Sequence, residues 1–177
     1  MRFCRLRFNL YLLPLLVCLA LSGCTMFQHK HEPVSVLRVH VESEAASVGS
    51  TKTISLLRSH PVSINISTDP ILTEADVQSA RLLDSPGGFA IELKFEETAG
   101  WRLEQYSAIN PGKHLAIFSQ WSETEKDGRW LAAPQISRRI GNATLVFTPD
   151  ASHEEAEKIV AGLTIAAKKN AGLKDQQ

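Results

Sequence analysis

The chain has 177 residues, 44% hydrophobic and 21% charged, which fits one domain of ordinary size with a core of its own. Its formal net charge is zero. Without the first 23 residues, 16 basic and 19 acidic residues remain, which gives a net charge of −3. A mildly acidic domain argues against nucleic-acid binding and against electrostatic attachment to anionic lipid, since both need a basic face. Of the three cysteines, Cys4 and Cys18 lie in the N-terminal stretch and only Cys24 follows it, which excludes a disulfide framework and a cysteine zinc site.

The first 23 residues predict an export signal. Arg2, Arg5 and Arg7 form a positive segment, and the apolar run 10–21 follows it. This run has the length of a signal-peptide core and is short for a membrane-spanning helix, which needs ~20 apolar residues. Pro14 lies in its middle and further weakens a stable span.

The apolar run ends in Leu21, Ser22, Gly23 and Cys24, which resemble the lipobox of bacterial lipoproteins. In that motif small residues admit the chain to the signal peptidase, and the cysteine thiol accepts a diacylglyceryl group. The resemblance implies that Cys24 is the first mature residue and carries two or three acyl chains, enough for stable anchoring. The alternative is an ordinary secretory signal with a chance cysteine. Thr25 in place of Asp implies, by the sorting rule of diderm bacteria, the outer rather than the inner membrane.

A short tether is predicted to follow the anchor. The nine residues after Cys24 show no periodicity and reach at most ~30 Å, which keeps the folded part near the membrane. His29 and His31 lie in this tether without a neighbouring Cys or Asp, so no metal site is expected there. The predicted organisation is a signal peptide at 1–23, a lipidated tether at 24–33, a folded domain at 34–166 and a polar C-terminal tail at 167–177.

The first half of the domain predicts strands joined by turns. Valines at 34–41 predict a first strand, and residues 54–57 predict a short second one. Residues 62–67 alternate apolar with polar side chains, as a half-buried strand does. Residues 73–76 form a capping-box pattern that predicts a short helix. The clearest strand is predicted at 89–96, with four apolar side chains toward the helices: Phe89, Ile91, Leu93 and Phe95.

A helix is predicted at 98–109. Its apolar side is expected to hold Leu103 together with Trp101, Tyr106 and Ile109, and Trp101 is assigned to the core. The Asn-Pro-Gly sequence that follows predicts the end of this helix.

The last third of the domain predicts a hairpin, a strand and a second helix. Strands are expected at 115–118 and at 130–140, the second interrupted at Pro134, around a charged loop at 123–128, and a last strand at 145–147. A second capping box, Ser152 to Glu155, predicts a helix at 152–166. The elements together predict an α+β fold, a two-layer sandwich with a mostly antiparallel sheet and amphipathic helices packed on one face.

Residues 71–163 resemble the head subdomain of the first periplasmic domain of SecD and SecDF, membrane proteins that assist protein export. Gly112 lies in one shared block, where a positive φ is expected, and Gly100 follows another, where close packing is expected. The order and spacing of the blocks carry the resemblance, which covers about half of the chain. The blocks are 72–77 with Ala80, 91–95 with Gly100 and Leu103, 111–117, and 132–136 with Ile140, closed by Thr148 and 154–156.

The resemblance implies the fold and a capacity to hold polypeptide. It does not extend to force generation, because SecD carries proton-conducting transmembrane helices and no such segment is predicted after residue 23. The Leu-Asp pair that usually follows the Leu-Ala-Ile strand is also replaced here, by Phe118 and Ser119.

Catalytic patterns are absent from the sequence. It contains no glycine-rich phosphate loop, no His-Glu-x-x-His and no Gly-x-Ser-x-Gly, and acylation of Cys24 leaves no free thiol. Neighbouring glutamates at 96–97 and 154–155 point apart on a regular element, so they form no acid/base pair. We therefore expect no enzyme activity, no catalytic residue, no cofactor and no small-molecule substrate.

Two function hypotheses remain for a lipid-anchored protein that faces the periplasm. In the first, the domain is a non-catalytic binding or accessory module that contacts exported or unfolded polypeptide through an exposed sheet edge. Trp121 and Trp130, which flank the loop 122–129, are the candidate contact residues. In the second, it is a structural or assembly lipoprotein of the cell envelope. The two tryptophans are then packed in the core or across strands, and the edge is covered by the 34–41 strand.

Overall fold

Residues 35–44, 50–57, 61–122 and 128–174 are described by the computed structural model. The chain divides into two units, residues 1–31 and 32–177, and the described residues all belong to the second. The predicted signal, Cys24, the tether and most of the charged loop lie outside the described residues. The elements in chain order are β1 (Val36–Val41), β2 (Thr51–Leu56), β3 (Val62–Ser67), β4 (Leu72–Thr73), the 3-10 helix η1 (Glu74–Asp76), β5 (Val77–Ser85), β6 (Gly88–Phe95), α2 (Glu97–Ile109), β7 (Leu115–Gln120), β8 (Gly128–Ala132), β9 (Thr144–Phe147) and α3 (His153–Lys174).

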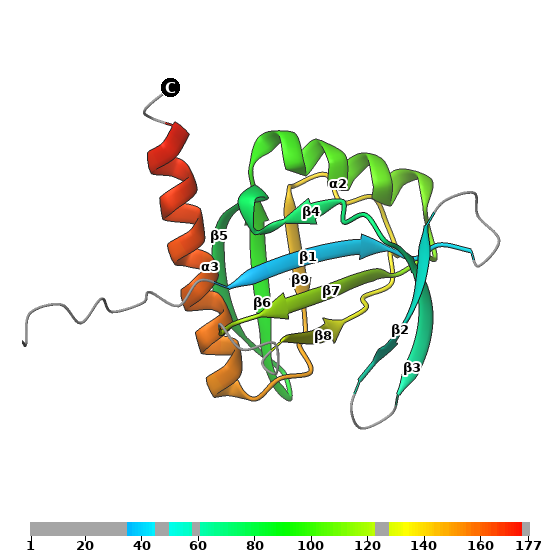
Figure 1. The fold of residues 1–177 in the computed structure, drawn as a ribbon, viewed down its shortest axis with the longest axis horizontal. Coiled ribbons are helices and arrows are strands. Elements are labelled where there is room, and N and C mark those ends of the chain that lie inside the picture. The colour runs from blue at the N-terminus through cyan, green and yellow to red at the C-terminus, as the bar shows by residue number, and fades with distance from the viewer. Residues whose placement is uncertain (1–34, 45–49, 58–60, 123–127, 175–177) are drawn as a thin grey trace, which may run out of the picture. The chain divides into compact units, whose positions relative to one another are not determined.

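The described strands form three sheets, and all their pairings are antiparallel. The β1 sheet has the order β4-β1-β7-β8, and the β6 sheet has the order β5-β6-β9. Strands β2 and β3 form a separate two-stranded ribbon. In Figure 1, α3 runs beside β5 at one side of the molecule, α2 crosses the top, and the β2–β3 ribbon stands at the opposite side.

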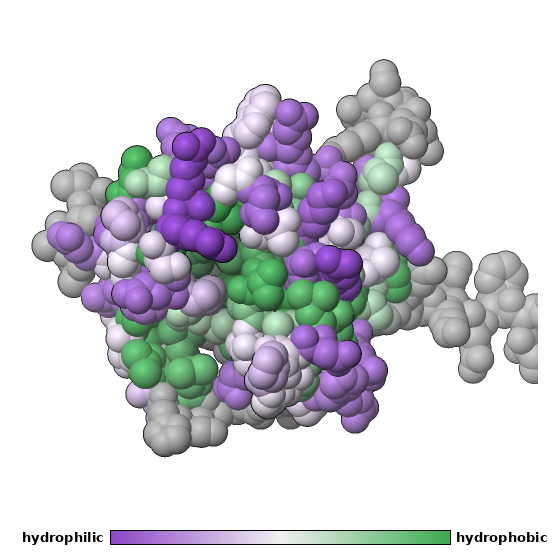
Figure 2. Space-filling view, turned by 180° about the vertical axis from the view of Figure 1, so that it is seen from behind, coloured by the Kyte–Doolittle hydropathy of each residue, from purple (hydrophilic) through white to green (hydrophobic). Residues whose placement is uncertain are grey.

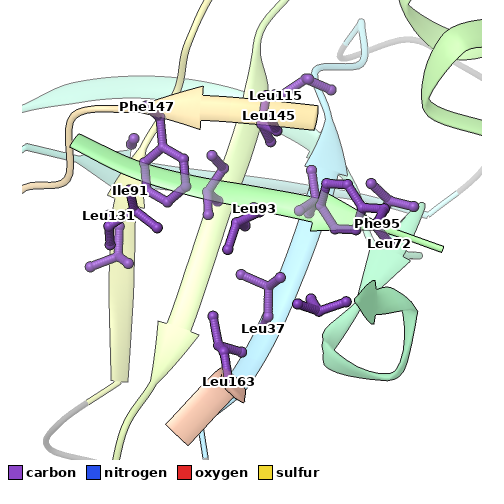
Figure 3. Close-up of a cluster of buried hydrophobic side chains, with 14 of the residues drawn as sticks. Leu37, Leu72, Ile91, Leu93, Phe95, Leu115, Leu131, Leu145, Phe147 and Leu163 are labelled. Atoms are coloured by element: carbon purple, nitrogen blue, oxygen red, sulfur yellow. The ribbon is translucent and has the colours of Figure 1, made fainter. Parts of the chain in front are cut away.

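The core fills the space between the β1 sheet and the β6 sheet. Leu93 of β6 is fully buried and lies near Leu37 of β1 and Leu163 of α3 (Figure 3). Side chains from both sheets and both helices belong to this one cluster, so each element contributes its apolar face to the same interior. Its largest fully buried members include Leu37, Leu72, Ile91, Leu93, Phe95, Leu103, Leu115, Ile117, Leu131, Ile159 and Leu163.

The α+β class with mostly antiparallel pairing is confirmed. The alternation in β6 gives the expected face, with Ile91, Leu93 and Phe95 buried and Phe89 half-buried. The strands divide into three sheets rather than one, and the apolar face of β6 meets the β1 sheet as well as the helices.

The short helix expected after Thr73 is only the single turn η1, and a nine-residue strand follows it. The Asp76 carboxylate accepts hydrogen bonds from the Thr73 N–H at 2.8 Å and from its hydroxyl at 3.2 Å, which closes the turn. Strand β5 then pairs with β6 through a tight turn, in which Gly87 and Gly88 have φ of 87° and 157°. Because the residues after η1 pair with β6 as strand β5, the helix ends after one turn.

The prediction of Trp101 as a core residue is wrong, because its side chain is 62% exposed. Helix α2 turns a different face inward, with Ala99, Gly100, Leu103 and Ser107 buried. The reason is Gly100, where an added Cβ would lie 2.5 Å from the Cβ of Ala143. The helix packs through its small residues against this segment, which confirms the close packing expected at Gly100 and leaves the indole outside.

Helix α3 begins as expected and ends later than expected. The Glu155 N–H donates to Ser152 Oγ at 3.2 Å, and the Ser152 N–H donates to the Glu155 carboxylate at 2.7 Å, so the second capping box is confirmed. The helix continues to Lys174, so the tail predicted from residue 167 is helical over 167–174. Ala166 and Ala167 are buried, and this packing holds the extra turns.

The middle of α3 packs directly against the start of β1. An added Cβ at Gly162 would overlap the backbone nitrogen and side chain of Ser35. Only glycine fits at this crossing, so helix and strand meet at backbone distance. Ser35, the residue just before β1, is therefore held close against α3.

Candidate functional site

Strand β9 forms one edge of the β6 sheet. The other edge, β5, is covered by α3, so β9 is the open one of the two. The Phe95 N–H donates to the carbonyl of Ala143 at 2.9 Å, and Leu93 pairs with Leu145 in the same register. Paired residues alternate between bonded and non-bonded in an antiparallel ladder, so the main-chain groups of Thr144 and Val146 point away from β6. Within the described residues, no hydrogen bond reaches the N–H or C=O of Val146.

A groove of about 600 Å³ runs along this edge, between β9 and the segment 134–142. Its floor is apolar, because Leu115, Ile136 and Leu145 line it and belong to the core cluster. Its rim carries the guanidinium of Arg138 and the half-exposed side chain of Val146. Figure 2 shows the molecule from behind, where hydrophobic side chains gather in the hollowed middle of the surface between hydrophilic ones.

The outer wall of the groove is held in place by hydrogen bonds to the end of α2. Ile136 donates its N–H to the Lys113 carbonyl and accepts one from the Gly112 N–H, both at 2.8 Å. The Ile140 N–H donates to Ser107 Oγ at 2.8 Å, and Arg139 forms an ion pair with Glu104 of α2. These contacts preform the groove, so a ligand would not need to order the wall.

Gly112 makes the wall possible by its backbone conformation. Its φ is +85°, as expected from the sequence, and no atom lies within 4 Å of an added Cβ. Its carbonyl accepts a hydrogen bond from the Gln135 side chain at 2.9 Å, so the turn after α2 and the groove segment are joined on both sides.

Trp121 lies inside the core and is 7% exposed. The guanidinium of Arg129 covers its ring at 4.8 Å, and the same guanidinium pairs with Glu155 at 2.6 Å. The two tryptophans therefore do not form an exposed pair, and Trp121 has little surface to offer to a partner.

Trp130 is half-buried on the opposite face of the β1 sheet from the core. Its ring contacts Phe118 and His40 edge to face, with centroid distances of 5.4 Å for both pairs. It lines a pocket of about 310 Å³ together with Arg38 and Lys52. Contact between Trp130 and a polypeptide stays a prediction.

His40 forms the polar floor of the Trp130 pocket. Burial lowers its pKa below the usual 6.5, although a hydrogen bond from Nδ1 to the Ser67 carbonyl at 2.8 Å acts in the opposite direction. The ring is therefore neutral at pH 7, with its proton on Nδ1, and adds no charge to the pocket.

Neither a metal site nor a membrane span emerges from the described structure. Across its four described ranges, no three His, Cys, Asp or Glu side chains gather as a metal ion would need. No helix in the same ranges is long and apolar enough to cross a bilayer. The His114 ring pairs with Glu42 at 2.6 Å, and the two histidines 114 and 153 lie apart on different elements.

The arrangement is that of a small α+β domain with an exposed sheet edge at β9, and comparison with known proteins gives its family. The family model for the SecDF P1 head subdomain matches residues 51–167, well over half of the chain. The chain belongs to this family. The four sequence blocks that carry the resemblance all lie inside the matched range, and no curated protein matches the chain.

Two solved structures are similar to the chain over 75% of its length. One is described as "Structure and function of a membrane component SecDF that enhances protein export", with 25% identity, a TM-score of 0.52 and 63% of that chain covered. The other is "Crystal structure of SecDF in Super-membrane-facing form", with 26% identity, a TM-score of 0.55 and 19% of that chain covered. This chain therefore spans less than two thirds of either SecDF chain.

Proposed function

We propose that the protein is a non-catalytic accessory module of protein export, anchored by lipid at Cys24, that holds extended polypeptide on the periplasmic side of the envelope. The observation that carries the binding role is the open edge of β9 beside a preformed apolar groove. An extended chain added to this edge gains main-chain hydrogen bonds with any sequence, and the groove adds contacts for alternate side chains. The likeness to a SecDF component that enhances protein export supports the same role.

In this proposal the contact surface for polypeptide is β9, not the loop flanked by Trp121 and Trp130. Trp121 is buried, and β1 lies inside its own sheet between β4 and β7, so it does not cover the β9 edge. The apolar floor and the single free rim cation, Arg138 within the described residues, favour a guest of alternating apolar and uncharged or acidic residues. The affinity is expected to be micromolar or weaker, since the guest loses conformational entropy on binding.

The sharpest test replaces Val146 by proline. Val146→Pro removes the outward N–H that would pair with a guest, and it leaves the β6–β9 hydrogen bonds intact because those use the neighbouring residues. Val146→Ala is the matched control, since it removes the same side chain and keeps the N–H. Binding is measured by titrating a fluorescently labelled peptide of about ten residues that alternates valine and serine.

We expect the proline variant to lose binding at least about tenfold and the alanine variant to retain most of it, because one lost main-chain bond costs about 1.4 kcal/mol or more here. Equal peptide affinity of Val146→Pro and Val146→Ala would show that β9 is not the binding site. The Trp130→Ala variant then shows whether the Trp130 pocket binds instead. No binding of the wild type up to millimolar peptide would favour the structural-lipoprotein hypothesis.

The anchor is tested separately by mass. The membrane-extracted protein should lack residues 1–23 and carry acyl mass on Cys24, and Cys24→Ala should abolish both changes. An alanine variant that stays processed and membrane-bound like the wild type would contradict the lipobox assignment.

A further inference from the structure

Helix α2 carries an outward stripe of uncharged side chains that no described element covers. Trp101 and Ile109 are 62% and 69% exposed, and they lie two helical turns apart on this stripe. The other members are also exposed and complete one face at spacings of three and four residues: Thr98, Gln105 and Ala108. The exposed tryptophan and isoleucine lie on one regular face, and apolar patches rimmed by polar residues are typical of sites that meet a protein or a membrane.

The charges beside the stripe are neutralised. Arg102 on one flank forms an ion pair with Asp76, and Glu104 on the other flank pairs with Arg139. Glu97 lies in the first turn, at the positive end of the helix dipole. The stripe itself contains no charged side chain, which fits a zwitterionic lipid surface better than a charged partner.

The stripe lies close to the point where the chain enters the domain. The Leu37 N–H donates to the Glu74 carboxylate at 3.0 Å, and Arg38 pairs with the same carboxylate. Two residues later in η1, Asp76 pairs with Arg102 of α2. A single turn of helix thus joins the start of β1 to the first half of α2, and Figure 1 shows both on the same side of the molecule.

The length of the tether brings the stripe within reach of the bilayer. Ser35 follows Cys24 by eleven positions, which corresponds to at most about 40 Å of extended chain. A domain held this close meets the bilayer at an effective concentration in the millimolar range, so weak adhesion suffices. Indole rings favour the bilayer interface, because their apolar part can contact lipid while the N–H group binds water.

We propose that the outer stripe of α2 lies on the lipid bilayer, with Trp101 in the interface, and so fixes the orientation of the domain. The inference rests on the proposed anchor at Cys24. Seated in this way, the domain keeps a constant side toward the membrane instead of turning freely on its tether.

The test uses the full acylated chain in vesicles of phosphatidylcholine with brominated acyl chains, which quench indole emission on contact. One variant keeps only Trp101, through Trp121→Phe and Trp130→Phe, and its matched control keeps only Trp130, through Trp101→Phe and Trp121→Phe. Emission of Trp101 should be at least about twofold lower in brominated than in ordinary vesicles, and emission of Trp130 should be unchanged. If Trp121→Phe impairs folding, the wild type and Trp101→Phe give the same comparison, because Trp121 is buried.

Each failure has its own signature. Gln105→Glu places a charge at the centre of the stripe and should remove the quenching while the protein still floats with the vesicles. Flotation without quenching of Trp101 overturns the docking face, and protection of Trp101 from acrylamide only in native membranes assigns it to a protein partner instead. Loss of flotation overturns the anchor and the docking with it. Peptide binding at β9 is scored independently through Val146→Pro.

Discussion

Replacing Glu155 by glutamine should show how much the contact between the start of α3 and strand β8 contributes to stability. The Glu155 carboxylate accepts hydrogen bonds from Arg129 Nη2 at 2.6 Å and from the Ser152 N–H at 2.7 Å. The hydrogen bond from Arg129 is the largest of several causes that lower its pKa from 4.5 to about 2, against the opposing effect of burial. The same guanidinium covers the ring of Trp121. The Glu155 carboxylate therefore caps α3 and, through Arg129, positions β8 and the buried ring of Trp121.

The pKa shift sets the size of the effect. At 1.36 kcal/mol per unit, a shift from 4.5 to about 2 corresponds to at most about 3 kcal/mol of folding free energy. The Glu155 side chain is 27% exposed, so solvent screening reduces this to about 1–2 kcal/mol. Because the pKa is lower in the folded state, this stabilisation is complete above about pH 5 and is lost as the pH falls through 4.5 toward 2.

Urea unfolding of the non-acylated chain from residue 25 onward measures this directly at pH 7, 4 and 2. Glu155→Gln should be less stable than the wild type by about 1–2 kcal/mol at pH 7, and the gap should close by pH 2. Glu154→Gln is the matched control in the same helical turn. Its carboxylate pairs with Lys158, which lowers its pKa, but both side chains are exposed and solvent screens the pair, so the pH dependence should stay close to that of the wild type. A gap for Glu155→Gln that is equal at pH 7 and pH 2 would refute the reasoning.

Three further changes test the packing. Leu93→Asp buries an unpaired carboxylate at a fully buried position and should destabilise the domain by about 4 kcal/mol, so an unchanged melting temperature would show that the register of β6 is wrong. Gly100→Ala should cost about 1–3 kcal/mol in urea unfolding because its methyl meets Ala143, and Ala143→Gly should restore the loss in the double variant. Gly112→Ala should cost about 1–2 kcal/mol through its φ of +85° alone, which a comparison of unfolding midpoints at constant slope would detect.

Local patterns in the sequence predict most of the strands and the starts of both α-helices, although the strand expected at 130–140 ends at Ala132. The alternation from Phe89 to Phe95 predicted the buried face of β6, and the Ser152–Glu155 capping box predicted the first turn of α3. Strand β5 was missed because its alternation is interrupted, and the structure has a register shift between Val77 and Ser79. The helix signal at residues 73–76 was real but lasted one turn, because pairing with β6 outweighs a local cap.

The candidate site was beyond local reasoning because it depends on contacts between distant segments. Val146 looks like an ordinary strand residue in the sequence, and only the sheet order places it at an open edge. Trp101 was assigned to the core by its hydrophobicity, but the contact of Gly100 with Ala143 decides which side of α2 turns inward. Trp121 and Trp130 flank the same loop, yet one lies in the core and the other on the far face of the sheet.

The entry of the chain at Ser35 determines how the domain bears mechanical load. Force applied to the chain before Ser35 reaches β1 first, and β1 pairs with β7 from Val36 to Val41 over its whole length and with β4 on its other side. The hydrogen bonds of an antiparallel ladder are perpendicular to the strands, so the component of force along β1 loads all of them in shear. The domain is therefore loaded at an internal strand, and the close contact of Ser35 with Gly162 braces the residue just before that strand. This attachment resists load in the way that the proposed anchor at Cys24 and the proposed polypeptide site at β9 would require.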